Sequence, residues 1–173
     1  MREIRWHARA GQGAKTASHL LATAMLQAGK NVQAFPEYGP ERRGAPMRAF
    51  NRFDERPIRR HDAVERPDVV VVLQPSLMQN GDVTEGLKPG GIVLVNSEKP
   101  YDGAICIPAS RIAPTSVNLV MLGALAAVLG EPPLESLVEA AVELLGKKAD
   151  SEALRAAIAA GYIAAKEEAP CPV

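Results

Sequence analysis

The chain has 173 residues, and its 20 lysines and arginines balance 20 aspartates and glutamates, so its formal net charge is zero. Hydrophobic residues make up 47% and charged residues 23%, which excludes a disordered or collagen-like chain. Zero net charge and an aromatic content of 4% argue against nucleic-acid binding through bulk electrostatics or base stacking. We therefore expect a single domain over residues 1–173 with an aliphatic core and no nucleic-acid partner.

The cysteines and the apolar segments bear on the cellular compartment. Cys106 and Cys171 form neither a C-x-x-C pair nor a disulfide framework. The longest apolar helix candidate, residues 119–129, is about half as long as a membrane-spanning helix. No basic stretch followed by an apolar one opens the sequence. These observations predict a cytoplasmic protein with no membrane partner.

The charges are distributed unevenly along the chain. Residues 1–66 carry 13 basic and 7 acidic side chains, a net charge of +6. Residues 67–173 carry 7 basic and 13 acidic side chains, a net charge of −6. A basic first part favours an anionic ligand or partner on the N-terminal side of the domain, and a mixed, solvated surface is the alternative.

The first elements are predicted to form a right-handed βαβ unit. Residues 4–7 alternate as a strand does and run into a glycine turn at residues 11–13. Residues 14–28 have alanines and leucines at helical spacing and end at Gly29, a residue typical of helix C-termini. Residues 31–35 then have the pattern of a second strand, and the order strand, helix, strand predicts the crossover.

The rest of the chain is predicted to complete an α/β fold, a three-layer α/β/α domain. Residues 47–53 alternate as a half-exposed strand does, and Ile58 is expected to begin a short return strand. The β-branched runs 68–73 and 91–96 are typical of strands buried on both faces, and residues 104–107 form a shorter strand. The sheet is therefore expected to be mixed and mostly parallel, with a helical C-terminal third. The predicted helices are residues 116–129, 134–145 and 151–166.

Several catalytic signatures are absent from the sequence. There is no cysteine array for an iron–sulfur cluster, no G-x-S-x-G nucleophile elbow, and no complete phosphate loop around Lys15 and Thr16. The histidines His7, His19 and His61 are scattered and are expected to be structural or solvated. The sequence therefore provides no catalytic residue and no metal site.

The glycine turn is the first candidate binding feature. Glycines allow the backbone to approach an anion closely, and the N–H groups and positive dipole end of the following helix attract phosphate. The turn therefore predicts phosphate contacts from Gly11, Gln12 and Gly13, and from Thr16 at the helix start. It lacks the full G-x-G-x-x-G dinucleotide fingerprint, because position 16 is threonine. A tight turn without a ligand is the alternative.

The second candidate feature is segment 35–46, in which residues 36–46, rich in proline and glycine, are predicted to be a stiff loop after the second strand. Its paired arginines, Arg42 and Arg43, are permanently charged and suit phosphate or carboxylate recognition. They would lie near the glycine turn if the first two strands are neighbours. Alternatively, Glu37 or Glu41 pairs with them and braces the loop. The residues assigned to an interface or to bracing are Phe35, Glu37, Gly39, Pro40, Glu41, Gly44 and Pro46.

The same residues carry a resemblance to a known family. The runs G-Q-G-A-x-T-A at residues 11–17 and F-P-E-Y-G-P-E-R-R-G-A-P at residues 35–46 resemble the gamma subunit of 2-oxoacid:ferredoxin oxidoreductases, its pyruvate type in particular. One departure is Ala10, where the family usually has glycine, so no positive φ is expected there. The likeness covers nearly the whole chain and continues at residues 48–52, 67–71 and 118–125.

The resemblance implies a reaction shared among subunits. In that family, thiamine diphosphate and iron–sulfur clusters on partner subunits of the alpha, beta and delta types carry out the oxidative decarboxylation of pyruvate. Ferredoxin receives the electrons, and coenzyme A takes the acetyl group as acetyl-CoA. The gamma subunit binds neither thiamine diphosphate nor a cluster, helps form the coenzyme A side of the active site, and holds the assembly together. For this chain, the resemblance implies a subunit that is inactive alone and that exposes an apolar patch and forms a homo-oligomer when isolated.

Three hypotheses follow from the residues and the resemblance. In the leading one, the chain is a pyruvate-type gamma subunit that binds the phosphates of coenzyme A through the glycine turn and Arg42 or Arg43. In the second, it is a free-standing module that binds coenzyme A or a nucleotide. In the third, it is a purely structural subunit whose arginine loop contacts a partner and no ligand. The identity of the copurifying chains separates the first hypothesis from the second.

Overall fold

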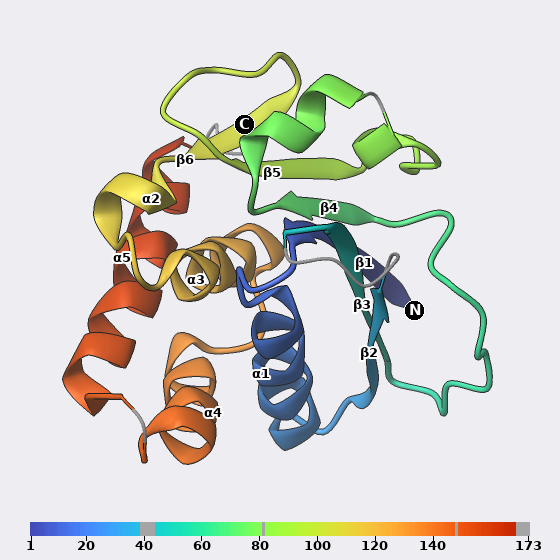
Figure 1. Ribbon diagram of the computed structural model, residues 1–173. Coiled ribbons are helices and arrows are strands. Elements are labelled where there is room, and N and C mark those ends of the chain that lie inside the picture. Colours follow the sequence, from blue (N-terminus) through green and yellow to red (C-terminus); the bar gives the residue numbers. More distant parts are fainter. Residues whose placement is uncertain (39–43, 81, 148, 169–173) are drawn as a thin grey trace.

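The computed structural model describes residues 1–38, 44–80, 82–147 and 149–168. Figure 1 shows a sheet with the long helices gathered on one of its faces. The strands are β1 (Arg2–Arg9), β2 (Asn31–Tyr38), β3 (Pro46–Asp54), β4 (Val69–Val72), β5 (Ile92–Asn96) and β6 (Ala104–Ile107). The α-helices are α1 (Ala14–Gln27), α2 (Ala109–Ile112), α3 (Val117–Leu129), α4 (Leu134–Leu145) and α5 (Ser151–Glu168), and the 3₁₀ helices are η1 (Pro75–Asn80) and η2 (Asp82–Thr84). The predicted α/β class, mixed sheet and helical C-terminal third are confirmed.

The first two strands, β1 and β2, are not neighbours in the sheet, contrary to the expectation from the sequence. The order is β2-β3-β1-β4-β5-β6, so β3 lies between β1 and β2. β3 pairs antiparallel with both, for example Ala49 with Trp6 and Phe50 with Phe35. β1, β4, β5 and β6 pair in parallel. The crossover through α1 therefore skips one position, which a later segment of the chain fills.

Two further predictions about segments next to these strands are wrong. Residues 36–38 continue β2 instead of opening a loop, and Pro36 is tolerated there because β2 is an edge strand. Ile58 begins no strand, since residues 57–61 have no regular structure. The short elements α2, η1 and η2, of three to six residues each, were not predicted, because elements this short have no periodicity to detect.

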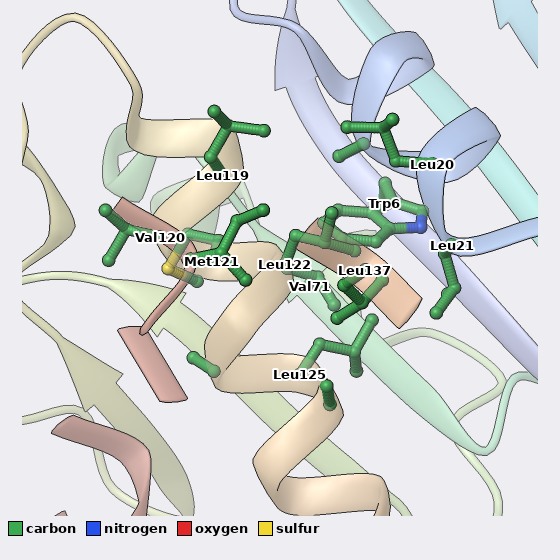
Figure 2. Packing of buried hydrophobic residues seen from close by; sticks show 14 of the residues in the cluster. Trp6, Leu20, Leu21, Val71, Leu119, Val120, Met121, Leu122, Leu125 and Leu137 are labelled. Atoms are coloured by element: carbon green, nitrogen blue, oxygen red, sulfur yellow. The ribbon is translucent and has the colours of Figure 1, made fainter. Parts of the chain in front are cut away.

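The main hydrophobic core lies between the sheet and the helices α1, α3, α4 and α5. Trp6 and Val71 of the sheet are fully buried there, beside residues of α3 (Figure 2). Every residue of α3 from 119 to 127 is buried, so α3 is the central helix of the layer. The Trp6 indole N–H donates to Asn51 Oδ1 at 2.9 Å, and Asn51 Nδ2 donates to the Ser18 carbonyl at 2.8 Å. The polar groups enclosed by this core are thus paired.

Helices α3 and α5 cross at two glycines. A Cβ atom added at Gly161 would lie 1.8 Å from the Val120 carbonyl oxygen, and one added at Gly123 would lie 1.9 Å from the Ile158 carbonyl oxygen. Both distances are far below van der Waals contact, so this close crossing requires glycine at each position. The crossing fixes the position of α3 in the layer. It thereby also fixes the first turn of α3, which lies near the carboxyl ends of the parallel strands.

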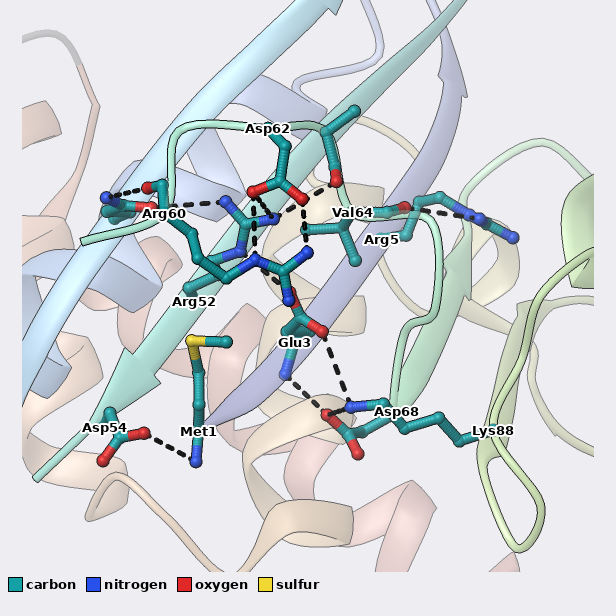
Figure 3. A network of polar contacts seen from close by, with 12 residues as sticks. Met1, Glu3, Arg5, Arg52, Asp54, Arg60, Asp62, Val64, Asp68 and Lys88 are labelled. Carbon is teal, nitrogen blue, oxygen red and sulfur yellow. Dashed lines mark hydrogen bonds and ion pairs between the residues drawn. The ribbon is translucent and has the colours of Figure 1, made fainter. Parts of the chain in front are cut away.

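The opposite face of the sheet has two different halves. Under β4 and β5, Val70 and Val93 pack with Leu77 of η1 and Val83 of η2 in a second, smaller apolar core. Under β1, β2 and β3, the same face carries charged side chains, and the coil between β3 and β4 covers it (Figure 3). The layer opposite the α-helices therefore consists of 3₁₀ turns and coil.

Few large apolar side chains are exposed in the described part of the chain. In the part of the chain that the structure describes, no helix combines the length and the apolar character needed to cross a bilayer. The large hydrophobic side chains exposed there are Met1, Leu26, Leu144 and Ile163, and they belong to different segments of the fold. The apolar patch expected on an isolated subunit stays a prediction.

Candidate functional site

The predicted glycine turn connects β1 to α1 and has two glycines in the left-handed region. Gly11 has a φ of 95° and Gly13 a φ of 81°. A Cβ atom added at Gly13 would also lie 2.6 Å from Asn118 Nδ2. Position 13 therefore needs glycine both because its φ is positive and because no side chain fits there. Ala10 does not adopt a positive φ, and within the described residues only glycines do. The shape of the turn therefore depends on Gly11 and Gly13.

Gln12 links this turn to the end of the neighbouring strand. Its Oε1 accepts the Arg9 backbone N–H at 2.7 Å, and its Nε2 donates to Gln74 Oε1 at 2.6 Å. Gln74 Nε2 in turn donates to Ser76 Oγ at 3.2 Å. This chain of amides joins the ends of β1 and β4, which are adjacent parallel strands.

A cleft of about 500 Å³ opens at the carboxyl ends of the parallel strands. The connection after β1 leads to β2 at one edge of the sheet, whereas the connection after β4 leads to β5 on the other side. The cleft therefore lies between β1 and β4, where the direction of the crossovers reverses. Open α/β sheets commonly bind ligands at such a switch point. The lining residues, none of which has an ionisable side chain, are Gly11, Gln12, Gly13, Leu73, Gln74, Pro75, Asn96, Ser110, Pro114, Thr115, Val117 and Asn118.

Two helices begin at this cleft. α1 follows Gly13 and α3 follows Ser116, and neither helix receives a side-chain hydrogen bond at its N-cap. Asn118, in the first turn of α3, donates from Nδ2 to the Gly13 carbonyl at 3.3 Å, which holds the two helix ends together. The N–H groups of a first helical turn have no partner within the helix and carry a partial positive charge of about half a unit. The cleft is therefore electropositive through its backbone.

Asn96, at the end of β5, builds the wall of the cleft away from α1. Its Nδ2 donates to the Leu73 carbonyl and to Ser110 Oγ, both at 2.9 Å. Its Oδ1 accepts the Ser110 backbone N–H at 3.0 Å, and the residue is only 5% exposed. Three hydrogen bonds thus hold this polar wall in one arrangement.

The structure brings together part of the predicted site. Gly11, Gln12 and Gly13 line the cleft. Thr16 lies half-buried on α1 and is not one of the lining residues. The predicted positions that lie outside the described residues are Gly39, Pro40, Glu41, Arg42 and Arg43.

The last residues of segment 35–46 do lie against the glycine turn. The Ala10 backbone N–H donates to the Ala45 carbonyl at 2.9 Å, and Arg9 Nη1 donates to the Gly44 carbonyl at 2.9 Å. Pro46 is the register partner of Arg9 in the β1–β3 pair. This proximity of residues 44–46 arises through β3 and not through pairing of the first two strands, and the proximity predicted for Arg42 and Arg43 lies outside the described residues.

The first residues of the same segment belong to a strand. The rings of Phe35 and Phe50 lie 5.1 Å apart across β2 and β3. Glu37 Oε2 lies 2.9 Å from Arg48 Nε, its register partner on β3. Pro46 is the first residue of β3 and is exposed. Within the described residues, Glu37 thus braces the β2–β3 pair.

The histidines lie away from any catalytic arrangement. His7 is 8% exposed, and its Nε2 accepts the Arg5 Nε–H at 2.9 Å. Burial, together with the positive charges of Arg5 and Arg48, lowers the pKa of His7 to about 3, so this imidazole is neutral at physiological pH. His19 and His61 are exposed. The described residues also contain no group of three or more His, Cys, Asp or Glu side chains that could hold a metal ion.

The comparison with known families decides the relationship. The family of pyruvate ferredoxin/flavodoxin oxidoreductases matches residues 3–164, nearly the whole chain. The chain belongs to this family. The resemblance predicted from the sequence is thereby confirmed.

Relatives within the oxidoreductase family are similar over most of their length. The chain is 48% identical to the pyruvate synthase subunit PorC of Thermotoga maritima over 187 residues, which cover 98% of this chain and 95% of the relative. It is 47% identical over 159 residues to the common gamma subunit of the pyruvate/ketoisovalerate oxidoreductases of Thermococcus kodakarensis, covering 83% of this chain and 86% of that subunit.

Solved structures confirm the fold of this oxidoreductase-family chain. The crystal structure of the pyruvate oxidoreductase subunit PORC of Thermotoga maritima has a TM-score of 0.82 at 43% identity, covering 94% of this chain and 95% of that one. A 2-oxoglutarate:ferredoxin oxidoreductase chain from Magnetococcus marinus shares the fold at 24% identity, with a TM-score of 0.81. The match covers 97% of this chain and 32% of the Magnetococcus chain, so there the same fold forms part of a longer polypeptide.

Sequence reasoning missed half of the cleft in this family member. Gln74 directly follows the buried run of β4, and Asn96 ends β5. A polar residue at the carboxyl end of a parallel strand is a signal that could have found both. Ser110 and Asn118 carry no such signal, because only the packing of α2 and α3 brings them to the cleft.

Proposed function

We propose that this chain is the gamma subunit of a pyruvate-type 2-oxoacid:ferredoxin oxidoreductase and that its cleft binds the phosphates of coenzyme A. Family membership and the similarity to pyruvate-type gamma subunits support the first part. The observation that carries the second part is the meeting of two helix N-termini, both without side-chain caps, at one cleft on the switch point of the sheet.

The donors around the cleft fit a phosphate group. Backbone N–H groups at the starts of α1 and α3 are oriented before any ligand arrives, so binding loses little conformational entropy. The amides of Gln12 and Asn118 are held by hydrogen bonds and add neutral polar surface. Arg42 or Arg43 would add a permanent positive charge, worth about 1.5–3 kcal/mol per charge-assisted hydrogen bond.

The role of the chain in this proposal is to bind and orient coenzyme A. Bound coenzyme A supplies the thiol that takes the acetyl group. The residues lining the cleft have no ionisable side chain, so they position the phosphate end and transfer no proton. Thiamine diphosphate and the iron–sulfur clusters belong to the alpha, beta and delta partner subunits in this proposal, ferredoxin receives the electrons, and the assembly is cytoplasmic. We expect the chain to form a homo-oligomer when isolated, and to neither decarboxylate pyruvate nor reduce a viologen dye.

A matched pair of glycine substitutions tests the cleft. Gly13 and Gly29 both have a φ of 81° and lie at opposite ends of α1. Alanine at either position meets backbone strain of about 1–2 kcal/mol. At Gly13 the added methyl group also displaces Asn118, whereas at Gly29 no atom lies within 4 Å of it. In the assembled enzyme, Gly13→Ala should raise the coenzyme A concentration for half-maximal turnover at least tenfold, and Gly29→Ala should leave it within about twofold.

The arginine pair provides the second test. Arg42→Ala or Arg43→Ala should weaken coenzyme A binding by very roughly 10–100-fold, while gel filtration still shows a complete set of subunits. A purely structural subunit would behave differently, because the complex would lose subunits and any intact fraction would bind coenzyme A normally. Unchanged affinity in Gly13→Ala, Arg42→Ala and Arg43→Ala complexes would rule out the phosphate site.

A further inference from the structure

Residues 55–68 cross the charged half of the sheet as a coil, and we call this segment the strap. The strap has no helix or strand, yet side chains of the sheet bind its backbone. Arg52 Nη2 donates to the Ala63 carbonyl at 3.2 Å, and Gln33 Nε2 donates to the Arg60 carbonyl at 2.8 Å. These hydrogen bonds replace the ladder that a strand would have, and they fix the path of the strap.

Buried arginines are the main anchors of the strap. Arg52 is fully buried, and its Nε donates to Glu3 Oε1 at 2.8 Å. Arg5 is 3% exposed and donates from Nη1 to the carbonyls of Val64 and Glu65, at 3.5 and 3.4 Å. Figure 3 shows both guanidinium groups among the residues of this network. A segment held in this way is ordered before any partner arrives, so a partner that binds it does not have to order it.

Most acidic side chains of the strap form ion pairs with basic side chains outside the strap. Asp68 Oδ2 lies 2.9 Å from Lys88 Nζ, and Glu55 pairs with Lys30. Asp62 Oδ1 lies 3.4 Å from the buried Arg52 Nη2. The negative charges of the strap are thus neutralised within the chain, apart from Glu65, for which the described residues show no ion pair.

Three arginines of the strap make no such contact with the sheet. By contrast, Arg60 and Asp62 pair with Glu3 and Arg52 of the sheet, and Figure 3 shows them there together with Val64. Arg56, Arg59 and Arg66 are exposed, and no carboxylate of the described residues lies within 4.0 Å of their charged groups. Within the described residues, the strap therefore presents three exposed guanidinium groups without an ion pair on a fixed backbone.

We propose that the strap is a docking surface for a carboxylate-rich face of another subunit of the assembly, with Arg56, Arg59 and Arg66 as the contacting groups. The proposal rests on the subunit part of the proposed function and not on the coenzyme A cleft. Arginine binds carboxylates through two parallel hydrogen bonds and is enriched at protein interfaces. The strap has no Phe, Tyr or Trp for base stacking, and its Ile58 is half-buried, so a protein partner is favoured over a nucleic acid or a membrane.

Charge reversal in the co-expressed, assembled enzyme tests this surface. The triple variant Arg56→Glu, Arg59→Glu, Arg66→Glu is compared with Lys99→Glu, Lys147→Glu, Lys166→Glu, which changes the net charge equally at exposed positions outside the strap. The strap variant should weaken association of this chain with the other subunits at least 100-fold at 50 mM salt, measured by gel filtration over a dilution series. The control should change it less than threefold. Equal effects in the two variants would contradict the proposal.

A second experiment keeps the charge and identifies the partner. In the assembled Arg56→Lys, Arg59→Lys, Arg66→Lys enzyme, a carbodiimide joins an amine to a carboxylate that touches it. Mass spectrometry should find these three positions joined to Asp or Glu residues of a different subunit. No such cross-link in an intact complex, or cross-links only to a second copy of this chain, would overturn the proposal.

Binding to simple polyanions separates the classes of partner. The isolated full chain is titrated with fluorescent poly-L-glutamate, with single-stranded DNA, and with vesicles of 70% phosphatidylcholine and 30% phosphatidylserine. The expected result is binding to poly-L-glutamate that the strap charge reversal abolishes. Stronger strap-dependent binding to DNA or to vesicles would count against a protein partner. The strap-variant complex that still assembles should bind coenzyme A with unchanged affinity. This measurement distinguishes a failure of the strap proposal from a failure of the coenzyme A proposal.

Discussion

The two faces of the sheet bury β1 by opposite means. Toward the helices, Ile4 and Trp6 enter an apolar core, whereas on the other face Glu3 and Arg5 enter a network of charges. Both sets are almost completely buried. On the apolar face no single contact must have a particular direction, because the hydrophobic effect is non-directional, and stability there depends on how closely the side chains pack. The charged face requires every partner, because an ion left alone away from water is costly. The two faces should therefore respond differently to loss of a single group.

Arg52→Met should have the largest effect on stability. Methionine is apolar and unbranched and fills much of the same space, but it leaves the Glu3 carboxylate buried without its 2.8 Å partner. Breaking a buried pair in this way costs about 3–5 kcal/mol of unfolding free energy. Chemical denaturation followed by circular dichroism measures the loss.

The double variant Glu3→Leu with Arg52→Met sharpens the same comparison. Removing both charges turns this spot of the charged face into an apolar one, and replacement of both partners is often neutral or stabilising. We expect the double variant to recover at least half of the stability lost in Arg52→Met. A double variant less stable than the single one would show that Glu3 keeps a stabilising partner without Arg52, such as Lys88 Nζ at 3.5 Å.

The pH dependence of stability should come next in size. His7 has a folded-state pKa of about 3 against an ordinary value of 6.5, so between these values the unfolded chain binds a proton that the folded chain does not. The contribution of His7 to stability is therefore complete above pH 6.5 and falls as the pH decreases toward 3. Between pH 7 and pH 4 the loss from this one group is on the order of 3 kcal/mol.

His7→Gln isolates this contribution. The glutamine amide oxygen can accept the Arg5 Nε–H in place of the imidazole nitrogen, and it does not titrate. Denaturation midpoints of His7→Gln should depend less on pH between 7 and 4 than those of the original chain. The same change at the exposed His19 serves as the control and should leave the pH dependence unaltered.

On the apolar face, the expected effect of one added methyl group is smaller. Gly161→Ala places a carbon 1.8 Å from the Val120 carbonyl oxygen, and overpacking of this kind typically costs about 1–3 kcal/mol. The loss should appear although alanine favours a helix over glycine by about 1 kcal/mol. Ala156→Gly, at an exposed position of α5, measures that propensity term separately. A Gly161→Ala chain as stable as the original would mean that α3 and α5 separate at no cost.

The smallest effect is expected at an exposed ion pair of the helical layer. Arg155 holds Glu135 through two hydrogen bonds of 3.0 Å between α5 and α4, and this lowers the pKa of the Glu135 carboxyl. Both side chains face water, where solvent screens the pair. Arg155→Ala should produce no resolvable shift of the denaturation midpoint at 0.15 M salt, in contrast to Arg52→Met.

The helical side of the fold could be predicted from the sequence because its signals are local. Helix α4 has the predicted bounds, Leu134–Leu145, and β6 begins and ends at Ala104 and Ile107 as expected. Apolar spacing, Pro132 and Pro133 before α4, and the β-branched runs determine these elements within a few residues of the chain. The α3–α5 crossing is less local, yet its glycines lie in apolar helices that the periodicity already shows.

The charged face could not be predicted, because its partners are distant in the sequence. Glu3 and Arg52 are 49 residues apart, and Arg5 binds carbonyls 59 to 80 residues away. Charged residues alternating with apolar ones, as in β3, are typical of a solvated strand face, whereas Arg52 is fully buried. The glycine-turn half of the candidate cleft was found from the sequence alone, while the Asn96 half depends on the order of strands β4 and β5.

The insertion of β3 between β1 and β2 has a consequence for how the chain folds during its synthesis. β1 is made first, but its two neighbours in the sheet end at Asp54 and Val72. The N-terminal strand therefore leaves the ribosome with both edges unpaired. Its β3 edge can pair after about 45 further residues, and its β4 edge only after about 60, which is about 3–12 seconds at common elongation rates. Until β3 has been made, β1 can pack against α1 but has no strand of its own sheet to pair with, and the charged residues on its other face keep the unpaired strand from pairing with the wrong chain.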